Sequence, residues 1–235
     1  MKVVSAIIVF FVCNLVNAQS INFNSYANIT NEDFKSLVSQ FAQRTLPLST
    51  ENIIAEVNIW KINRRPLSSA NVERYLKDGG ELITGPLYSQ QQDGGLPDVD
   101  IVGDFYPLYK LPTNGNYVLL TFVQVDAKSE CSGLVFTLSF DLDGKFLYLS
   151  NYNYRPGTVN ITSTIDATLK SHLYYVVKTV NGASVDPPRT QNFSAEEAHL
   201  TYQINSDGRS TKISFVKANY QFMYDNNECR FKRVN

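Results

Sequence analysis

The chain has 235 residues, of which 43% are apolar, so it is long enough for one large domain with a proper core or for two small domains. Lysine and arginine number 21 against 22 aspartates and glutamates, and the only basic clusters are Arg64-Arg65 and the C-terminal tail. This balance argues against nucleic acid and against an anionic membrane as partners.

The first residues have the pattern of a secretory signal peptide. Lys2 precedes an apolar run of about ten residues, which is too short to span a bilayer as a helix, and Ala18 offers a small residue at a cleavage point. We therefore predict a signal peptide over 1–18 and a single β-rich domain over 19–235. The mature protein is expected to be secreted and extracellular, with a net charge of about −2.

Cysteine usage agrees with export. Cys13 lies in the predicted signal peptide, so Cys131 and Cys229 remain in the mature chain. An even count in a secreted protein favours one disulfide, and two unpaired thiols are the alternative.

Three N-x-S/T sequons predict that the protein is a glycoprotein. They begin at Asn28, Asn160 and Asn192. Asn160 is the strongest of the three, because it falls on the polar side of an alternating segment.

Two helices are expected, both near the start of the mature chain. Between residues 28 and 47, apolar residues recur at i, i+3, i+4 and i+7, namely Phe34, Leu37, Val38 and Phe41. Thr30 or Asn31 can cap this helix, and Pro47 ends it. A second, short helix is expected within 68–80, where two glycines follow the periodic residues.

Most of the remaining chain predicts β-strands joined by tight turns. The expected strands are 52–63, 99–111, 116–127, 133–142, 145–154, 158–173 with its continuation to 180, 198–205 and 211–224. Turn pairs separate many of them: Asn114-Gly115, Asp143-Gly144, Asn181-Gly182 and Asp207-Gly208. We therefore predict an α+β fold, mainly antiparallel β. A β-sandwich or barrel with small helices is the alternative.

The strands differ in how many apolar faces they have. Residues 158–173 alternate almost without a break, so that strand has one polar and one apolar face. Residues 116–125 and 145–154 are apolar on both faces, and both faces must therefore be covered. Either a curved sheet encloses an apolar channel, or a helix packs across the sheet without leaving a cavity.

Signals for catalysis and for metal binding are weak. The two histidines, His172 and His199, lack the spacing of a zinc site, and no nucleotide-binding or serine-hydrolase motif occurs. Asp141 and Asp143 resemble the start of a calcium loop, but Tyr152 stands where that loop needs glutamate. Asp98 and Asp100 form a carboxylate pair of a kind that is common by chance. A non-enzyme without cofactor or metal is the prediction.

Residues 97–165 resemble the insect takeout and juvenile-hormone-binding family. The segments that carry the resemblance are Gly103-Asp104-Phe105, Leu111-Pro112, Asp143-Gly144-Lys145 and Pro156-Gly157 with the residues that follow each of them. The resemblance implies a strongly curved antiparallel sheet wrapped on the N-terminal amphipathic helix, with an apolar tunnel for a hydrophobic ligand. The cysteine positions and the strand-like segments after residue 183 depart from the family's pattern.

The leading hypothesis is a secreted carrier of a lipid or terpenoid-like small molecule. Burial of the ligand's apolar area would drive binding. The candidate lining residues are Val118, Leu120, Phe122, Phe136, Leu138, Phe140, Leu147 and Leu149.

Other classes of function stay open on this sequence. A secreted structural, effector or venom protein acting through a protein partner is one, and silk-associated glycoproteins are an analogy for it. A β-pore-forming toxin is another, because its stem is also an amphipathic strand rich in serine and threonine.

Overall fold

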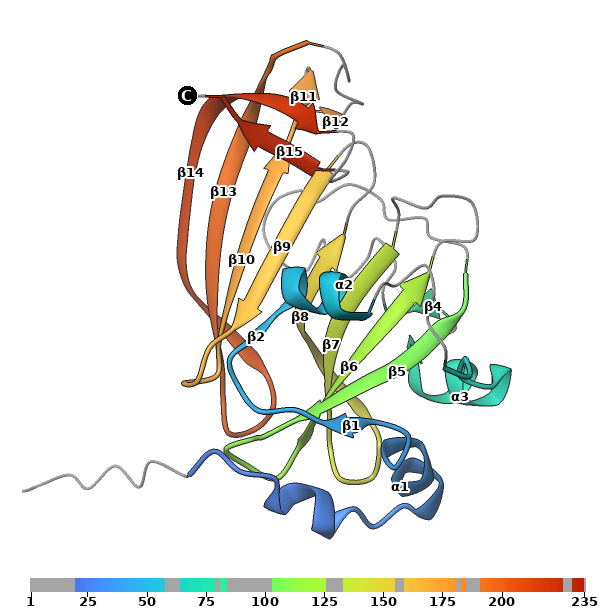
Figure 1. Cartoon of the computed structure of the whole chain (residues 1–235). Helices are drawn as coiled ribbons and strands as arrows, with labels where there is room; N and C mark the ends of the chain where they lie inside the picture. Colours follow the sequence, from blue (N-terminus) through green and yellow to red (C-terminus); the bar gives the residue numbers. More distant parts are fainter. Residues whose placement is uncertain are drawn as a thin grey trace, which may run out of the picture.

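The protein is α+β and mainly antiparallel β, as the computed structural model shows (Figure 1). The structure describes residues 20–57, 64–78, 81–83, 103–125, 133–154, 159–180, 183–184, 191–225 and 230–234. The predicted signal peptide therefore lies outside the described residues. None of the helices in the described ranges is long and apolar enough to cross a membrane.

Most of the strands form one large sheet. Its order is β1-β5-β6-β7-β8-β9-β10-β13-β14-β15, with β2 paired to β9. The main strands are antiparallel, as the turn pairs predicted, and among the described strands only β1 runs parallel to its neighbour. The path through the described strands has two ends, so the alternative of a closed barrel is wrong. The bounds are β1 Ala42–Gln43, β2 Leu48–Ser49, β5 Phe105–Leu111, β6 Val118–Val125, β7 Gly133–Phe140, β8 Phe146–Tyr154, β9 Val159–Ile165, β10 Lys170–Val177, β13 Phe193–Ile204, β14 Ser210–Asp225 and β15 Arg230–Arg233.

Two small hairpins stand apart from this sheet. One pairs β3 with β4, and the other pairs β11 with β12. Their bounds are β3 Lys77–Asp78, β4 Glu81–Leu82, β11 Thr179–Val180 and β12 Ala183–Ser184.

The expected N-terminal helix forms but is short. After the 3-10 helix η1, Asn24–Asn28, helix α1 spans Glu32–Val38. Asn31 caps it by accepting a hydrogen bond from the backbone N–H of Phe34. Phe34, Leu37 and Val38 are buried, as the apolar periodicity predicted. The expected second helix is α3, Ser69–Tyr75, which Ser68 caps.

The prediction of a strand at 52–63 is wrong over its first residues. Residues Thr50–Val57 form helix α2 instead, which packs on β7, β8 and β9. Apolar residues at 53, 54 and 57 fit a helical period as well as a strand, and a short apolar run cannot be assigned by periodicity alone.

The prediction of one long strand over 158–173 is also wrong. The segment is a hairpin, in which β9 and β10 pair with Ser171 opposite Ile165. The carboxylate of Asp166 accepts hydrogen bonds from the backbone N–H groups of Thr168 and Lys170, and Leu169 has a φ of 61°. These contacts are those of an Asx turn. The turn takes up four residues, an even number, so the alternation of polar and apolar residues continues from β9 into β10 and does not reveal the turn.

The buried apolar side chains of the described residues form three clusters. The first joins α1, α3 and residues of strands β5 to β10 and β13, and we call it the α1 cluster. The second includes Leu48 and Ile53 and packs against β5, β6 and β7, and we call it the α2 cluster. The third joins Phe193, Phe222 and Phe231 of the last three strands.

Candidate functional site

Six of the eight predicted ligand-binding residues lie together in the α1 cluster. They come from β6 and β7, their side chains are fully buried, and the register places them in three opposed pairs. The pairs are Val118 with Phe140, Leu120 with Leu138 and Phe122 with Phe136.

Aromatic contacts fill the space among these six residues. The rings of Phe122 and Phe136 stack with centroids 5.3 Å apart. Phe41, which follows α1, meets Phe122 edge-on at 5.0 Å, and Phe34 lies 5.4 Å from Phe140. Protein side chains therefore occupy this part of the α1 cluster, and a ligand would have to lie beside these rings.

The remaining two predicted residues, Leu147 and Leu149, lie in different clusters. Leu149 packs against the α1 cluster and Leu147 against the α2 cluster. The register between β7 and β8 shifts twice and skips Leu147 and Ser150. Each β-bulge reverses the alternation of side chains, so Leu147 and Leu149, which were both predicted to line one ligand site, pack against different clusters.

Three buried tyrosines gather where β8, β10 and β13 meet the α1 cluster. Tyr152, Tyr175 and Tyr202 are each less than one tenth exposed. Burial raises the pKa of Tyr152, and the nearby hydroxyls of Tyr202 and Tyr175 raise it further. These three residues, which we call the tyrosine cluster, form a polar end to an otherwise apolar region.

Polar atoms without partners concentrate on β8. Within the described part of the chain, Ser150 Oγ, Asn151 Nδ2, the Tyr152 hydroxyl and Asn153 Oδ1 are buried and have no hydrogen-bond partner. The buried hydroxyl of Tyr26, by contrast, lies 2.7 Å from the carbonyl oxygen of Leu111. Most buried polar groups in native proteins are paired, so four consecutive exceptions call for a bound molecule or ordered water.

The unpaired polar atoms of β8 were not predicted from the sequence. The pattern of residues 145–154 predicted only that both faces of this strand are apolar and covered. The run Ser150-Asn151-Tyr152-Asn153 places polar side chains inside a strand, next to β7, which is buried on both faces. Such a run is the sequence signal for an internal polar site.

Both histidines lie on β10 and β13 and face one polar hollow. His172 stands opposite Thr201, and His199 stands opposite Tyr174. His172 Nε2 lies 3.1 Å from a carboxylate oxygen of Asp166, and His199 Nε2 lies 3.1 Å from one of Glu197. No group of three or more His, Cys, Asp or Glu in the described ranges could hold a metal ion.

Several predicted site residues lie outside the described residues. These are both cysteines of the predicted disulfide, Cys131 and Cys229, and the carboxylate pair Asp98 and Asp100. The side chain of Asn160 also lies outside them, whereas Asn28 and Asn192 are exposed.

Comparison of the chain with protein-family models, with curated proteins and with solved structures finds no match. The fold and the geometry of the site therefore provide the evidence on function.

Proposed function

We propose that the protein is a secreted glycoprotein that carries a small hydrophobic ligand with one hydrogen-bonding end, such as a fatty acid or an oxygenated terpenoid. The observation that carries the proposal is the unpaired hydroxyl of Tyr152 in the tyrosine cluster, beside the apolar α1 cluster. A buried polar group left without a partner costs about 1–3 kcal/mol, and a ligand acceptor would remove that cost.

The surroundings of Tyr152 support an amphiphilic ligand rather than a purely apolar one. Phe136 of β7 stands opposite Tyr152, and both residues belong to the α1 cluster, while the hydroxyl of Tyr152 lies near those of Tyr175 and Tyr202. Binding sites of this kind combine a mostly apolar lining with a few polar groups that fix the orientation.

The resemblance to the insect takeout and juvenile-hormone-binding family agrees with this function. The same resemblance implies that the sheet curves strongly and wraps on α1. The burial of Phe34, Leu37 and Val38 in the same cluster as residues from β6 to β13 supports this arrangement. Catalysis, cofactors, metals and nucleic acid have no part in the proposed function.

Native mass spectrometry of the protein secreted by eukaryotic cells tests the proposal. We expect a co-purified lipid, and after delipidation we expect saturable uptake of a long-chain fatty acid. The variant Tyr152→Phe keeps the ring and removes the hydroxyl, so its affinity for the fatty acid should fall about fivefold, the usual worth of one hydrogen bond.

Tyr106→Phe is the matched control, because Tyr106 is half-buried on β5 and belongs to none of the three clusters. Its affinity should equal that of the wild type. Two results would contradict the carrier function: a delipidated protein that takes up no fatty acid, or equal affinity in Tyr152→Phe and the wild type. Ordered water would then be the partner of the β8 atoms.

A second candidate function is a secreted structural or effector protein that binds a protein partner. Strand β14 favours it, because Ile213, Phe215, Val216 and Met223 are large apolar side chains that are 41–64% exposed. Strand β15 pairs with β14 only from Phe222 to Asp225, so most of β14 extends past the region that β15 covers. Pull-down with the wild type and with Phe215→Ser compares the two: loss of a partner in the variant supports this candidate.

A further inference from the structure

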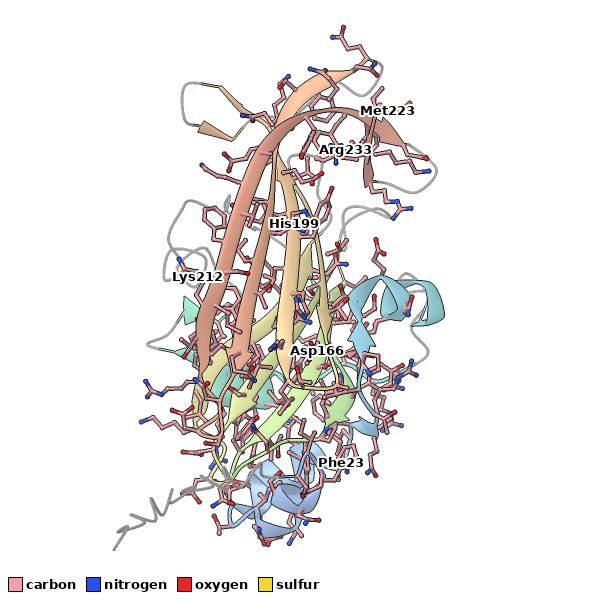
Figure 2. The ribbon with its side chains drawn as sticks, turned by 90° about the vertical axis from the view of Figure 1, so that its left-hand side faces the viewer. Phe23, Asp166, His199, Lys212, Met223 and Arg233 are labelled. Atoms are coloured by element: carbon pink, nitrogen blue, oxygen red, sulfur yellow. The ribbon has the colours of Figure 1, made fainter. Side chains whose placement is uncertain are left out.

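A polar hollow lies on the opposite side of β10 and β13 from Tyr175 and Tyr202. The strand register defines its floor as two rows of three side chains on one face of β9, β10 and β13. The first row is Thr162, Tyr174 and His199, and the second is Thr164, His172 and Thr201. We call these six residues the polar grid. Figure 2 labels His199 and, lower in the view, Asp166, whose carboxylate contacts His172 of the second row.

One wall of the hollow comes from a distant part of the chain. Strand β2 pairs with β9 so that Ser49 stands opposite Thr164, and Glu51 follows at the start of α2. Glu51 is itself held by Arg230 of β15 at 3.0 Å. Together with this wall, the polar grid lines a space of about 200 Å³ that is open to solvent.

Contacts within and beside the polar grid fix the orientation of its rings. The carboxylate of Asp166 holds His172, and Thr201 Oγ1 lies 3.3 Å from the other nitrogen of that imidazole. Glu197, which is 8% exposed, holds His199 and accepts a hydrogen bond from the Tyr174 hydroxyl at 3.0 Å. Side chains that are fixed by neighbours lose less entropy on binding, which favours recognition of a ligand.

The chemistry of the hollow excludes several ligand classes. Hydroxyl and imidazole groups make it too polar for a hydrocarbon chain, and the carboxylates beside it disfavour an anion. Glu51 is paired with the cation of Arg230, and Asp166 and Glu197 already accept hydrogen bonds from Thr168 and Tyr174. No group of three or more potential metal ligands occurs in the described ranges, so the hollow offers no coordination site for a metal cation.

What fits is a neutral ligand that is rich in hydroxyl groups. Serine, threonine and imidazole groups can each donate or accept, as sugar hydroxyls do. The rings of Tyr174 and His199 meet edge-on at 4.9 Å and offer an apolar surface for the C–H face of a sugar ring. A space of about 200 Å³ is below the range for drug-sized ligands, which limits the occupant to about one ring.

We infer that the polar grid binds one residue of a neutral saccharide. The site is separate from the tyrosine cluster, and the inference does not depend on the proposed carrier function. A secreted protein with such a site would attach to glycans of a surface or of another glycoprotein.

The chain contains only two histidines, and both belong to the polar grid, so their imidazole NMR signals report on this hollow alone. The experiment is a titration of the protein at pH 7 with the methyl glycosides of glucose, galactose, mannose and N-acetylglucosamine. We expect saturable shifts of both imidazoles with at least one glycoside, with a Kd on the order of 1–10 mM.

Thr201→Val and Thr164→Val keep the side-chain shape and remove one hydroxyl each, so each should weaken binding about fivefold or more. Thr45→Val is the matched control, because Thr45 is exposed and lies outside the hollow. Three results would overturn the inference: no saturable shift with any glycoside, equal binding by the wild type and both valine variants, or saturable shifts with acetate, methylammonium or zinc ions but with no glycoside.

Discussion

Thr50 and Ser163 are joined by three hydrogen bonds, one of them between their hydroxyl groups at 3.3 Å, although they lie 113 positions apart in the chain. Thr50 Oγ1 donates to the carbonyl oxygen of Ser163 at 2.9 Å and accepts from its backbone N–H at 3.0 Å. Asn153 Nδ2 also donates to this hydroxyl, at 3.2 Å. One buried hydroxyl thus fixes the first residue of α2 to both β8 and β9.

Replacing Thr50 with valine should destabilise the protein strongly. The substitution keeps the side-chain shape but leaves the buried N–H of Ser163 and the amide of Asn153 without their partner. We expect the free energy of unfolding, measured by urea denaturation, to fall by about 2–4 kcal/mol. Thr45→Val, the same change at an exposed position, should alter it by no more than about 0.5 kcal/mol. Equal effects at the two positions would contradict the role given to this hydroxyl.

Replacing a phenylalanine with alanine should destabilise the protein strongly in the α1 cluster and only slightly on β14. Phe122 is fully buried and contacts Phe41, Phe136 and Phe140, so Phe122→Ala should lower the free energy of unfolding by about 3–5 kcal/mol. Phe215 is 41% exposed, and Phe215→Ala should change it by no more than about 0.5 kcal/mol. Urea denaturation of both variants measures this contrast. A large loss for Phe215→Ala would indicate that β14 is covered in solution.

Local signals in the sequence predicted much of the fold. The Asp-Gly pairs were expected to form tight turns, and Gly144 and Gly208 have φ angles of +88° and +79°, which glycine adopts at little cost. The periodicity of Phe34, Leu37 and Val38 identified the buried face of α1. Turn chemistry and periodicity are determined by neighbours along the chain, so they can be read without knowledge of the fold.

The errors came from features that depend on distant contacts or that preserve the pattern. The Asx turn at Asp166 interrupts β9 and β10 without breaking the alternation, and the bulges at Leu147 and Ser150 reverse the faces of β8 without a marker in the sequence. The polar grid could be predicted only in part. The polar face of residues 158–173 was recognised, but the pairing that brings His199 beside Tyr174 depends on the sheet order.

Glycosylation at the exposed sequons would establish export. Asn28 and Asn192 are both exposed, so protein secreted from eukaryotic cells should have a mass above that of the polypeptide, and enzymatic removal of N-glycans should restore the lower mass. Asn192→Gln and Ser194→Ala disrupt the same sequon in two ways and should cause the same decrease in mass. A secreted wild-type protein with the mass of the bare polypeptide would contradict the prediction.

The stability of the β9–β10 turn should depend on the charge of Asp166. Burial of this carboxyl opposes ionisation, but hydrogen bonds from the backbone N–H of Lys170 and from Thr168 outweigh it, with a further bond from His172. Together they lower the pKa of Asp166 from 3.8 to about 2. The ionised carboxylate accepts these bonds most strongly, so the folded state gains from ionisation relative to the unfolded chain.

Because the folded pKa of Asp166 lies below the unfolded value, its contribution to stability is complete above about pH 4 and is lost as the pH falls toward 2. Asp166→Asn keeps an acceptor oxygen for the N–H groups of Thr168 and Lys170 but cannot titrate. The variant should therefore be less stable than the wild type at pH 6, and this difference should shrink between pH 4 and pH 2. Urea midpoints at several pH values in that interval measure it. A difference in stability that stays constant from pH 6 to pH 2 would contradict this prediction. It would mean that Asp166 has the same pKa in the folded and unfolded chains, and that its hydrogen bonds do not favour the charged form.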